Sequence, residues 1–286
     1  MDVTVATIAL ARGDDAERML AAMASLAEQG WYACVGDGGS SPEFVDRLRA
    51  MGHHVEQPGR GLRGQMEAAF EAAAERGTHV LYFESDKVNF ARTRVRVTIR
   101  QYRARGLDYA VAGRTRRLWE TFPLPQLEIE RAQCALMGEV LGTAGDWIGG
   151  PALLPSSHVA TLAESRFYGS DQHGWGVPWF LLGRAWANGL RVGIVKTATG
   201  VDPSARNEFN PGYRLYQANS ILGCFYEGAG ITYDWRGPTG QREAARPAGQ
   251  RYERQTDSWA LGPADHVEIQ GPVPSDWSRT PSSSQV

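Results

Sequence analysis

The sequence predicts an α/β protein in which a mainly parallel sheet is flanked by helices. Short apolar runs alternate with longer segments of helical periodicity through the first 86 residues, and a cluster of Gly, Asp and Ser follows the second run. One apolar run ends abruptly in two acids, Glu84 and Asp86. Because right-handed crossovers make the strands of such a chain parallel, their carboxyl ends gather at one edge of the sheet, where ligands bind.

Each element follows from its local pattern. Apolar runs predict strands, and segments that repeat Ala, Met and Leu at helical spacing predict helices. We expect strands at residues 3–10, 31–35 and 53–57, from residue 79 to the two acids, and at 109–112. We expect helices at residues 14–28, 42–51, 61–75 and 127–141.

The composition is that of a globular enzyme. The chain has 286 residues, 42% of them hydrophobic, which is enough for one large domain or two small ones. The net charge of −2 argues against a nucleic-acid partner, and we interpret the arginines between Arg92 and Arg117 as a solvated helix face. Three isolated cysteines suggest reduced thiols in the cytoplasm, and no apolar run is long enough to cross a bilayer.

The chain changes character twice. Strict alternation stops between residues 111 and 155, where Trp, Phe, Pro and Gly surround a single amphipathic helix. From about Trp235 the sequence is rich in Gly, Pro, Arg, Gln and Ser without periodicity, which predicts a flexible tail over residues 235–286.

The acids at the end of the fourth strand are the main indication of function. A strand that delivers carboxylates at its carboxyl end can hold a divalent cation against a diphosphate, which points to nucleotide-sugar chemistry. Asp37 falls at the same edge of the predicted sheet. The alternative is structural, since acids are common wherever a chain leaves the core.

The order of several short motifs resembles the glycosyltransferases of the GT-A fold, especially the family 2-like group. The motifs are residues 3–10, Gly36–Ser40, Gly61–Gln65, Glu84–Asp86 and Asp171–Trp179. Between them, Thr121–Gln126, Glu130, Gly145–Trp147 and Gly149-Gly150 are similar to bacterial enzymes that glycosylate small acceptors, such as mannosylglycerate and glucosylglycerate synthases. The resemblance implies a mixed, mainly parallel Rossmann-like sheet, with a further helix over 181–190 and a closing strand over 191–196. It makes 1–110 the nucleotide-sugar-binding half and 111–234 the acceptor-binding half of one domain.

The resemblance also assigns donor and metal residues. The positions that match donor-binding residues are Asp37, Arg63, Gly64, Glu84 and Asp86. Asp86 would bind Mg²⁺ or Mn²⁺ directly, and Glu84 would contribute directly or through water. Relatives often add a histidine after the last strand; here Asp202, Asn207, His173 or water would take that place. Asp37 has the alternative role of a turn aspartate, and Arg63 that of a surface arginine.

The remaining assignments concern the acceptor and the proton. Asp171 matches the acid that takes the acceptor proton in inverting relatives, with Asp146 as its rival and a helix N-cap as the alternative. In a retaining enzyme the leaving diphosphate would take that proton. Arg114 and Arg116 would bind an acidic acceptor, and Trp147, Trp175 and Trp179 would stack on sugar rings or else pack in the core. Tyr168 and Trp119 are weaker candidates for stacking.

We therefore expect a cytoplasmic, metal-dependent glycosyltransferase that moves a hexosyl group from a nucleoside-diphosphate sugar to a small polar acceptor. One alternative is a sugar nucleotidyltransferase, although that class opens with a Gly-rich, Lys/Arg-bearing loop and this chain has only Arg12-Gly13 there. Another is a catalytically silent sugar-nucleotide-binding module. Whether copies of the chain form a homo-oligomer is left open by the sequence.

Overall fold

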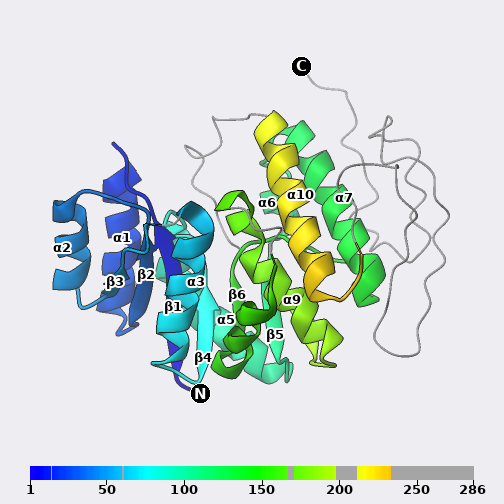
Figure 1. The fold of residues 1–286 in the computed structure, drawn as a ribbon, viewed down its shortest axis with the longest axis horizontal. Helices are drawn as coiled ribbons and strands as arrows, with labels where there is room; N and C mark the ends of the chain where they lie inside the picture. The colour runs from blue at the N-terminus through cyan, green and yellow to red at the C-terminus, as the bar shows by residue number, and fades with distance from the viewer. Residues whose placement is uncertain (14, 60, 167–170, 198–210, 233–286) are drawn as a thin grey trace.

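A single seven-stranded sheet with helices on both faces forms the body of the protein (Figure 1). The computed structural model describes residues 1–13, 15–59, 61–166, 171–197 and 211–232. The strands are β1 Val3–Ala9, β2 Ala33–Asp37, β3 His54–Glu56, β4 His79–Tyr82, β5 Tyr109–Gly113, β6 Ala152–Pro155 and β7 Val192–Lys196. The helices are α1 Asp15–Glu28, α2 Pro42–Ala50, α3 Gly61–Ala74, α4 Val88–Thr93, α5 Val95–Ala104, α6 Arg116–Trp119, α7 Leu124–Leu141, α8 Ser156–Val159, α9 Val177–Ala187 and α10 Pro211–Gly228, with 3₁₀ turns η1 Ala160–Glu164 and η3 Asp171–Gly176.

The strand order confirms the predicted mixed, mainly parallel sheet. Its order is β3-β2-β1-β4-β6-β5-β7. Parallel pairing joins β1 to β2 and β4, β2 to β3, and β5 to β7, whereas β6 runs antiparallel to both β4 and β5. Strands β1 to β5 and β7 therefore point the same way, and their carboxyl ends share one edge. The sheet continues through β6 from the predicted donor half into the predicted acceptor half.

Two apolar layers enclose the sheet. All seven residues of β1 are buried, as expected for a central strand covered on both faces. One layer joins Tyr82 of β4 to residues of α3, α9 and α10, and the other joins Leu81 to residues of α1, α2 and α5. Because neighbouring residues of a strand point to opposite faces, β4 contributes to both layers.

Gly36 shows how closely a helix approaches the sheet. A Cβ at this position of β2 would lie 1.9 Å from the backbone oxygen of Gln65 in α3. Only glycine permits this contact, which presses the first turn of α3 against the end of β2. The Gly36–Ser40 and Gly61–Gln65 motifs are thereby brought side by side.

Several elements differ from the prediction. Helix α7 begins three residues before the expected 127, α9 begins at 177 rather than 181, and β2 begins at 33 rather than 31. Strand β6 was not predicted, because four residues without polar alternation carry little strand signal. Helix α10 and the helical pair α4 and α5 were not placed either, although helical spacing of the arginines was noted.

The three cysteines are buried and free. Among the described residues, no helix is long and apolar enough to cross a membrane. The predicted tail, residues 235–286, lies outside the described part of the chain.

Candidate active site

The two acids follow β4 in a tight turn at the carboxyl edge of the sheet. The Lys87 amide donates to the Glu84 carbonyl at 3.0 Å, and the Val88 amide donates to the Asp86 carbonyl at 3.0 Å. Between the acids, the buried Ser85 hydroxyl donates to the carbonyl of Ile8 in β1 at 2.7 Å. This bond holds the turn against the central strand and limits its freedom. The predicted placement of both acids at the sheet edge is correct.

The two carboxylates have different surroundings. Glu84 forms an ion pair with Lys87, three residues later, and each side chain is 17% exposed. Asp86 is half-buried, and its charge adds to burial in raising the pKa of Tyr82. The fit to a divalent cation is therefore unequal, since the Glu84 oxygens already face an ammonium group. Asp86 remains the residue that is predicted to bind a cation directly.

Lys87 was not considered in the sequence prediction. Burial lowers the pKa of Lys87 to about 7, and the positive charges of Arg114 and Arg214 act in the same direction while Glu130 opposes them. A Cβ on Gly150 would lie 3.4 Å from Lys87 Cε, so the Gly149-Gly150 turn closes over this side chain. Lys87 therefore links the predicted metal-binding turn electrostatically to residues of the predicted acceptor half.

Asp37 ends β2 at the same edge and is 1% exposed. Its carboxylate accepts hydrogen bonds from the amides of Gly39 at 3.1 Å and Ser40 at 3.0 Å, and from the side chain of Gln57 at 3.1 Å. This geometry is that of a turn-forming aspartate. A donor contact by Asp37 stays a prediction that would require Gln57 to yield its place.

Arg63 and Gly64 lie in the first turn of α3, as predicted. The Arg63 Nε donates to Glu67 one turn later at 2.8 Å, with the Arg63 side chain 23% exposed. A Cβ on Gly174 would lie 2.5 Å from the Arg63 amide nitrogen, so η3 packs directly on this turn. The structure thus brings the Asp171–Gly176 segment to the amino end of the proposed phosphate-facing helix.

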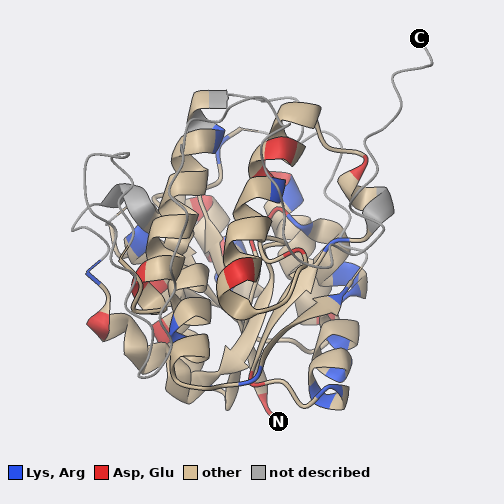
Figure 2. Ribbon diagram, turned by 90° about the vertical axis from the view of Figure 1, so that its right-hand side faces the viewer, with Lys and Arg blue, Asp and Glu red and all other residues tan. Residues whose placement is uncertain are grey.

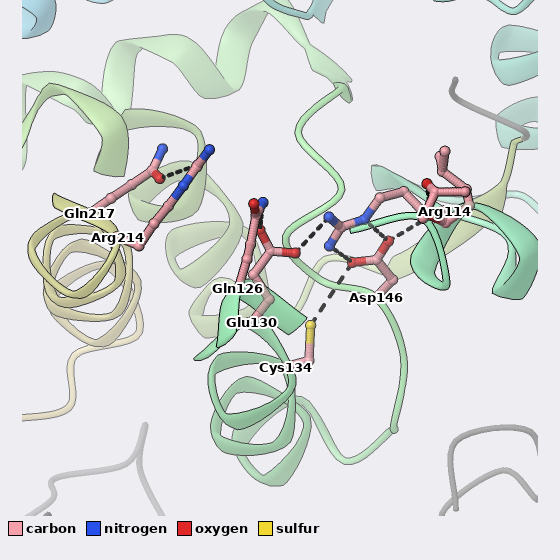
Figure 3. A network of polar contacts seen from close by, with 9 residues as sticks. Arg114, Gln126, Glu130, Cys134, Asp146, Arg214 and Gln217 are labelled. Carbon is pink, nitrogen blue, oxygen red and sulfur yellow. Dashed lines mark hydrogen bonds and ion pairs between the residues drawn. The ribbon is translucent and has the colours of Figure 1, made fainter. Parts of the chain in front are cut away.

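Arg114 and Asp146 form a buried ion pair behind the edge of the sheet (Figure 3). Asp146 accepts from Arg114 Nε at 2.8 Å, from Nη2 at 2.9 Å and from the Arg114 amide at 2.6 Å. Glu130 of α7 accepts from Arg114 Nη1 at 2.6 Å, and the guanidinium lies 4.0 Å from the centre of the Trp119 ring. Burial lowers the pKa of Arg114, but the carboxylates of Asp146 and Glu130 raise it by more. The pKa therefore lies above its ordinary value.

This pairing bears on two sequence assignments. The Arg114 side chain is 6% exposed and that of Asp146 is 2% exposed. Three of the roughly four hydrogen bonds that a carboxylate can accept are thus already made with Arg114, which leaves little of Asp146 for a substrate. We therefore expect both residues to shape the predicted acceptor half rather than to contact substrate.

The tryptophans are mainly structural. Trp147 is fully buried, and its indole N–H donates to the Thr143 carbonyl at 3.0 Å. Trp179 is 5% exposed and donates to the Trp147 carbonyl at 2.9 Å. Neither ring has a face open to a sugar, so core packing, the alternative role, describes them. Trp175 is only partly buried and keeps its place among the acceptor candidates.

Some predicted residues cannot be located. Asp202, Asn207 and Tyr168 lie outside the described residues, and the side chains of Arg116, Asp171 and His173 are likewise not described although their backbone lies in α6 and η3. Within the described side chains, no group of three His, Cys, Asp or Glu residues could hold a metal ion.

Arg214 is a second basic residue that the sequence prediction missed. It lies in α10, where its Nη1 donates to Gln217 at 2.9 Å, and it makes no ion pair with any described carboxylate. Its charge reaches Lys87, from which it is separated by 127 positions in the sequence. No local pattern marks it, because α10 itself was not recognised.

The fold has counterparts among solved structures. No protein-family model matches this chain, and no curated protein matches it. Among solved structures, glucosyl-3-phosphoglycerate synthase from Mycobacterium tuberculosis is similar at a TM-score of 0.54 and 16% identity, over 85% of this chain and 87% of that one. The same enzyme in complex with UDP matches at a TM-score of 0.54 and 14% identity, over 81% of each chain. Its complex with Mn²⁺, UDP and glucosyl-3-phosphoglycerate matches at 0.50 and 15%, again over 81% of each. At these identities the likeness concerns the architecture, and the chain therefore has the GT-A glycosyltransferase fold of that synthase.

Proposed function

We propose that this protein is a metal-dependent glycosyltransferase that moves a hexosyl group from a nucleoside-diphosphate sugar to a small, negatively charged acceptor. The observation that carries the proposal is the position of Asp86, which follows β4 at the carboxyl edge of a GT-A sheet. Similar structures hold UDP with Mn²⁺. The three buried, reduced thiols suit a cytoplasmic enzyme.

The donor would lie along the shared edge of β1, β2 and β4. Asp86 would hold Mg²⁺ or Mn²⁺, whose remaining ligands would be diphosphate oxygens, water and residues such as Asp202. The bound cation would offset the charge that builds on the departing nucleoside diphosphate. Arg63, at the amino end of α3, would contact phosphate oxygens, and Ser85 keeps the turn in position by its bond to β1.

The acceptor would lie between the metal-binding turn and α10. The positive charge of Arg214 contributes to lowering the pKa of Lys87, because like charges repel. An anion between the two residues would relieve this repulsion and favour the charged form of Lys87, and a phosphate or carboxylate on the acceptor would supply it. A similar structure binds phosphoglyceric acid. Asp171, in the η3 turn against α3, is the proposed base if the reaction inverts configuration.

Calorimetric titration with UDP and GDP, with and without Mn²⁺, tests the donor site. Wild type should bind one nucleotide only with the metal, and Asp86→Asn should weaken that binding about 100-fold, whereas Glu84→Gln should change it by less than about 5-fold because Lys87 already engages Glu84. Asp46→Asn is the control, since Asp46 is an exposed acid on α2. If neither nucleotide shows metal-linked binding, the transferase proposal is wrong.

Acceptor use gives the second test. With UDP-glucose or GDP-glucose and Mn²⁺, we expect release of nucleoside diphosphate to depend on a phosphorylated or carboxylated acceptor, and Arg214→Gln to raise the acceptor KM about 10-fold or more with the donor KM unchanged. Arg49→Gln, on α2, is the matched control. Equal activity with glycerol would contradict an anionic acceptor.

A catalytically silent sugar-nucleotide-binding module is the second candidate. Glu84, the first acid of the metal motif, is already paired with Lys87, which disfavours its binding to a metal ion. That reading predicts tight, metal-linked nucleotide binding without turnover on any acceptor. Binding followed by measurable transfer would exclude it.

A further inference from the structure

A groove of about 670 Å³ lies between the turn that joins α1 to β2 and the length of α5. This turn leads into the amino end of β2, and the end of α5 leads towards the amino end of β5. The groove is therefore at the opposite edge of the sheet from Asp86, Arg114 and Asp37. It has no part in the proposed transfer reaction.

Three arginines on one side of α5 line the groove: Arg96, Arg100 and Arg103. Arg96 donates to the Gln29 carbonyl at 3.4 Å and Arg103 to the Met1 carbonyl at 3.0 Å. None of the three forms an ion pair with a carboxylate in the described ranges, in contrast to Arg18, Arg47 and Arg49 on the neighbouring helices. Spacings of four and three residues place the three guanidinium groups along one line of the helix.

The local sequence explains why these charges are not neutralised. Residues 87–107 include seven Lys and Arg residues and no acid. In Figure 2, blue bands follow one another along the helix at the lower right, near the N-terminus. A helix face that is simply solvated more often carries both acidic and basic side chains, since i,i+4 pairs of opposite charge stabilise the helix.

Apart from Gln29, the rest of the lining is apolar, and it includes one buried donor. Ile99 of α5 is 7% exposed, and Trp31 lines the opposite side of the groove. The Trp31 Nε1 is buried and has no hydrogen-bond partner among the described residues. A buried N–H without an acceptor is unfavourable, and it would gain one if the Trp31 ring turned towards a ligand oxygen in the groove.

We propose that this groove binds an organic phosphate ester with two or more negative charges. The arginines would hold phosphate oxygens through forked N–H donors, which match phosphate better than a lysine does. The organic part would lie against the apolar surface that Trp31 and Ile99 contribute to the groove. The same chemistry is found in a soluble nucleotide and in an anionic lipid headgroup.

ATP binding in the presence of EDTA, measured by calorimetry and by Trp fluorescence, tests the groove. EDTA removes divalent cations and so prevents metal-linked binding at the proposed donor site. Wild type should bind saturably at one site, and Arg100→Gln/Arg103→Gln should raise the Kd at least 10-fold. Arg18→Gln/Arg49→Gln removes the same charge from α1 and α2 and should leave the Kd within 2-fold. Asp86→Asn should also leave it unchanged, which separates this proposal from the transferase proposal.

Binding to lipid vesicles distinguishes a lipid headgroup from a soluble phosphate ester as the ligand of the groove. Co-sedimentation with phosphatidylglycerol vesicles but not with phosphatidylcholine, lost in the Arg100/Arg103 double variant, would assign the groove to a lipid headgroup. ATP binding without co-sedimentation would assign it to a soluble ester. The proposal is overturned if neither probe binds, or if the double variant and its control bind alike. Melting curves of both double variants verify that each is folded.

Discussion

At the scale of single residues, the Arg114–Asp146 pair shows what is needed to bury two opposite charges. Asp146 accepts three hydrogen bonds from Arg114 while its side chain is 2% exposed. Transfer of both ions out of water is unfavourable, and only this geometry, with Glu130 and the Trp119 ring, compensates for it. The pair therefore fixes the arrangement of β5 relative to α7 more than it adds to net stability.

Removal of one partner should expose that cost. We expect Asp146→Ala to lower the free energy of unfolding by about 3–5 kcal/mol, because it leaves Arg114 buried without its main counter-ion. Urea denaturation measures the change. Glu17→Ala, which breaks the exposed pair with Arg47, is the control and should have little effect. If Asp146→Ala were as stable as wild type but inactive, Asp146 would be the catalytic base after all.

At the scale of elements, two glycines set the contact between α9 and α10. A Cβ on Gly183 would lie 2.2 Å from the Phe225 carbonyl oxygen, and one on Gly228 would lie 2.2 Å from the Phe180 carbonyl oxygen. Each helix thus packs against the backbone of the other. Helix propensity alone would make Gly183→Ala stabilising by about 1 kcal/mol, but the clash is with rigid backbone and outweighs it.

Gly183→Ala should consequently push α10 away from α9, and Arg214, which lies on α10, should move as well. We expect a loss of about 1–3 kcal/mol of stability and an increased acceptor KM, with metal-linked UDP binding retained because β1, β2 and β4 are not disturbed. Gly142→Ala is the control: Gly142 follows α7 at φ +72° with open space around it, so only a strain of about 1 kcal/mol is expected. Unchanged acceptor kinetics in a destabilised Gly183→Ala would argue against Arg214.

The elements also show what the sequence could and could not predict. The elements of the first 86 residues were predicted well for two reasons. Their strands are buried and strongly apolar, and strands and helices alternate regularly along this part of the chain. Strand β6 was missed because its partners, β4 and β5, lie far from it in the chain and it runs against them. Asp86 was found from the strand before it, whereas Lys87 and Arg214 meet only through the tertiary fold.

At the scale of the whole molecule, each face of the sheet contains one buried histidine bonded to a helix carbonyl. His53, before β3, contacts the Met23 oxygen of α1 at 3.0 Å, and His158 of α8 contacts the Leu181 oxygen of α9 at 2.9 Å. Burial lowers the pKa of both, more than these hydrogen bonds raise it. The neutral rings therefore donate from Nε2, and both layers of the fold depend on them.

Acid should accordingly weaken both layers together. A pKa that is lower in the folded state means that the unfolded chain binds protons first, so this contribution is complete above about pH 6.5 and is lost as the pH falls below it. The slope is at most about 1.4 kcal/mol per pH unit for each histidine. Glutamine retains an N–H donor but does not titrate, so His53→Gln/His158→Gln should flatten the decline in unfolding free energy between pH 7.5 and 5.5, measured by urea denaturation. Each single variant should remove part of the slope, because the two histidines lie in separate layers. An identical pH profile for wild type and the double variant would show that the acid sensitivity arises elsewhere, from the carboxylates or from His79, whose pKa burial also lowers.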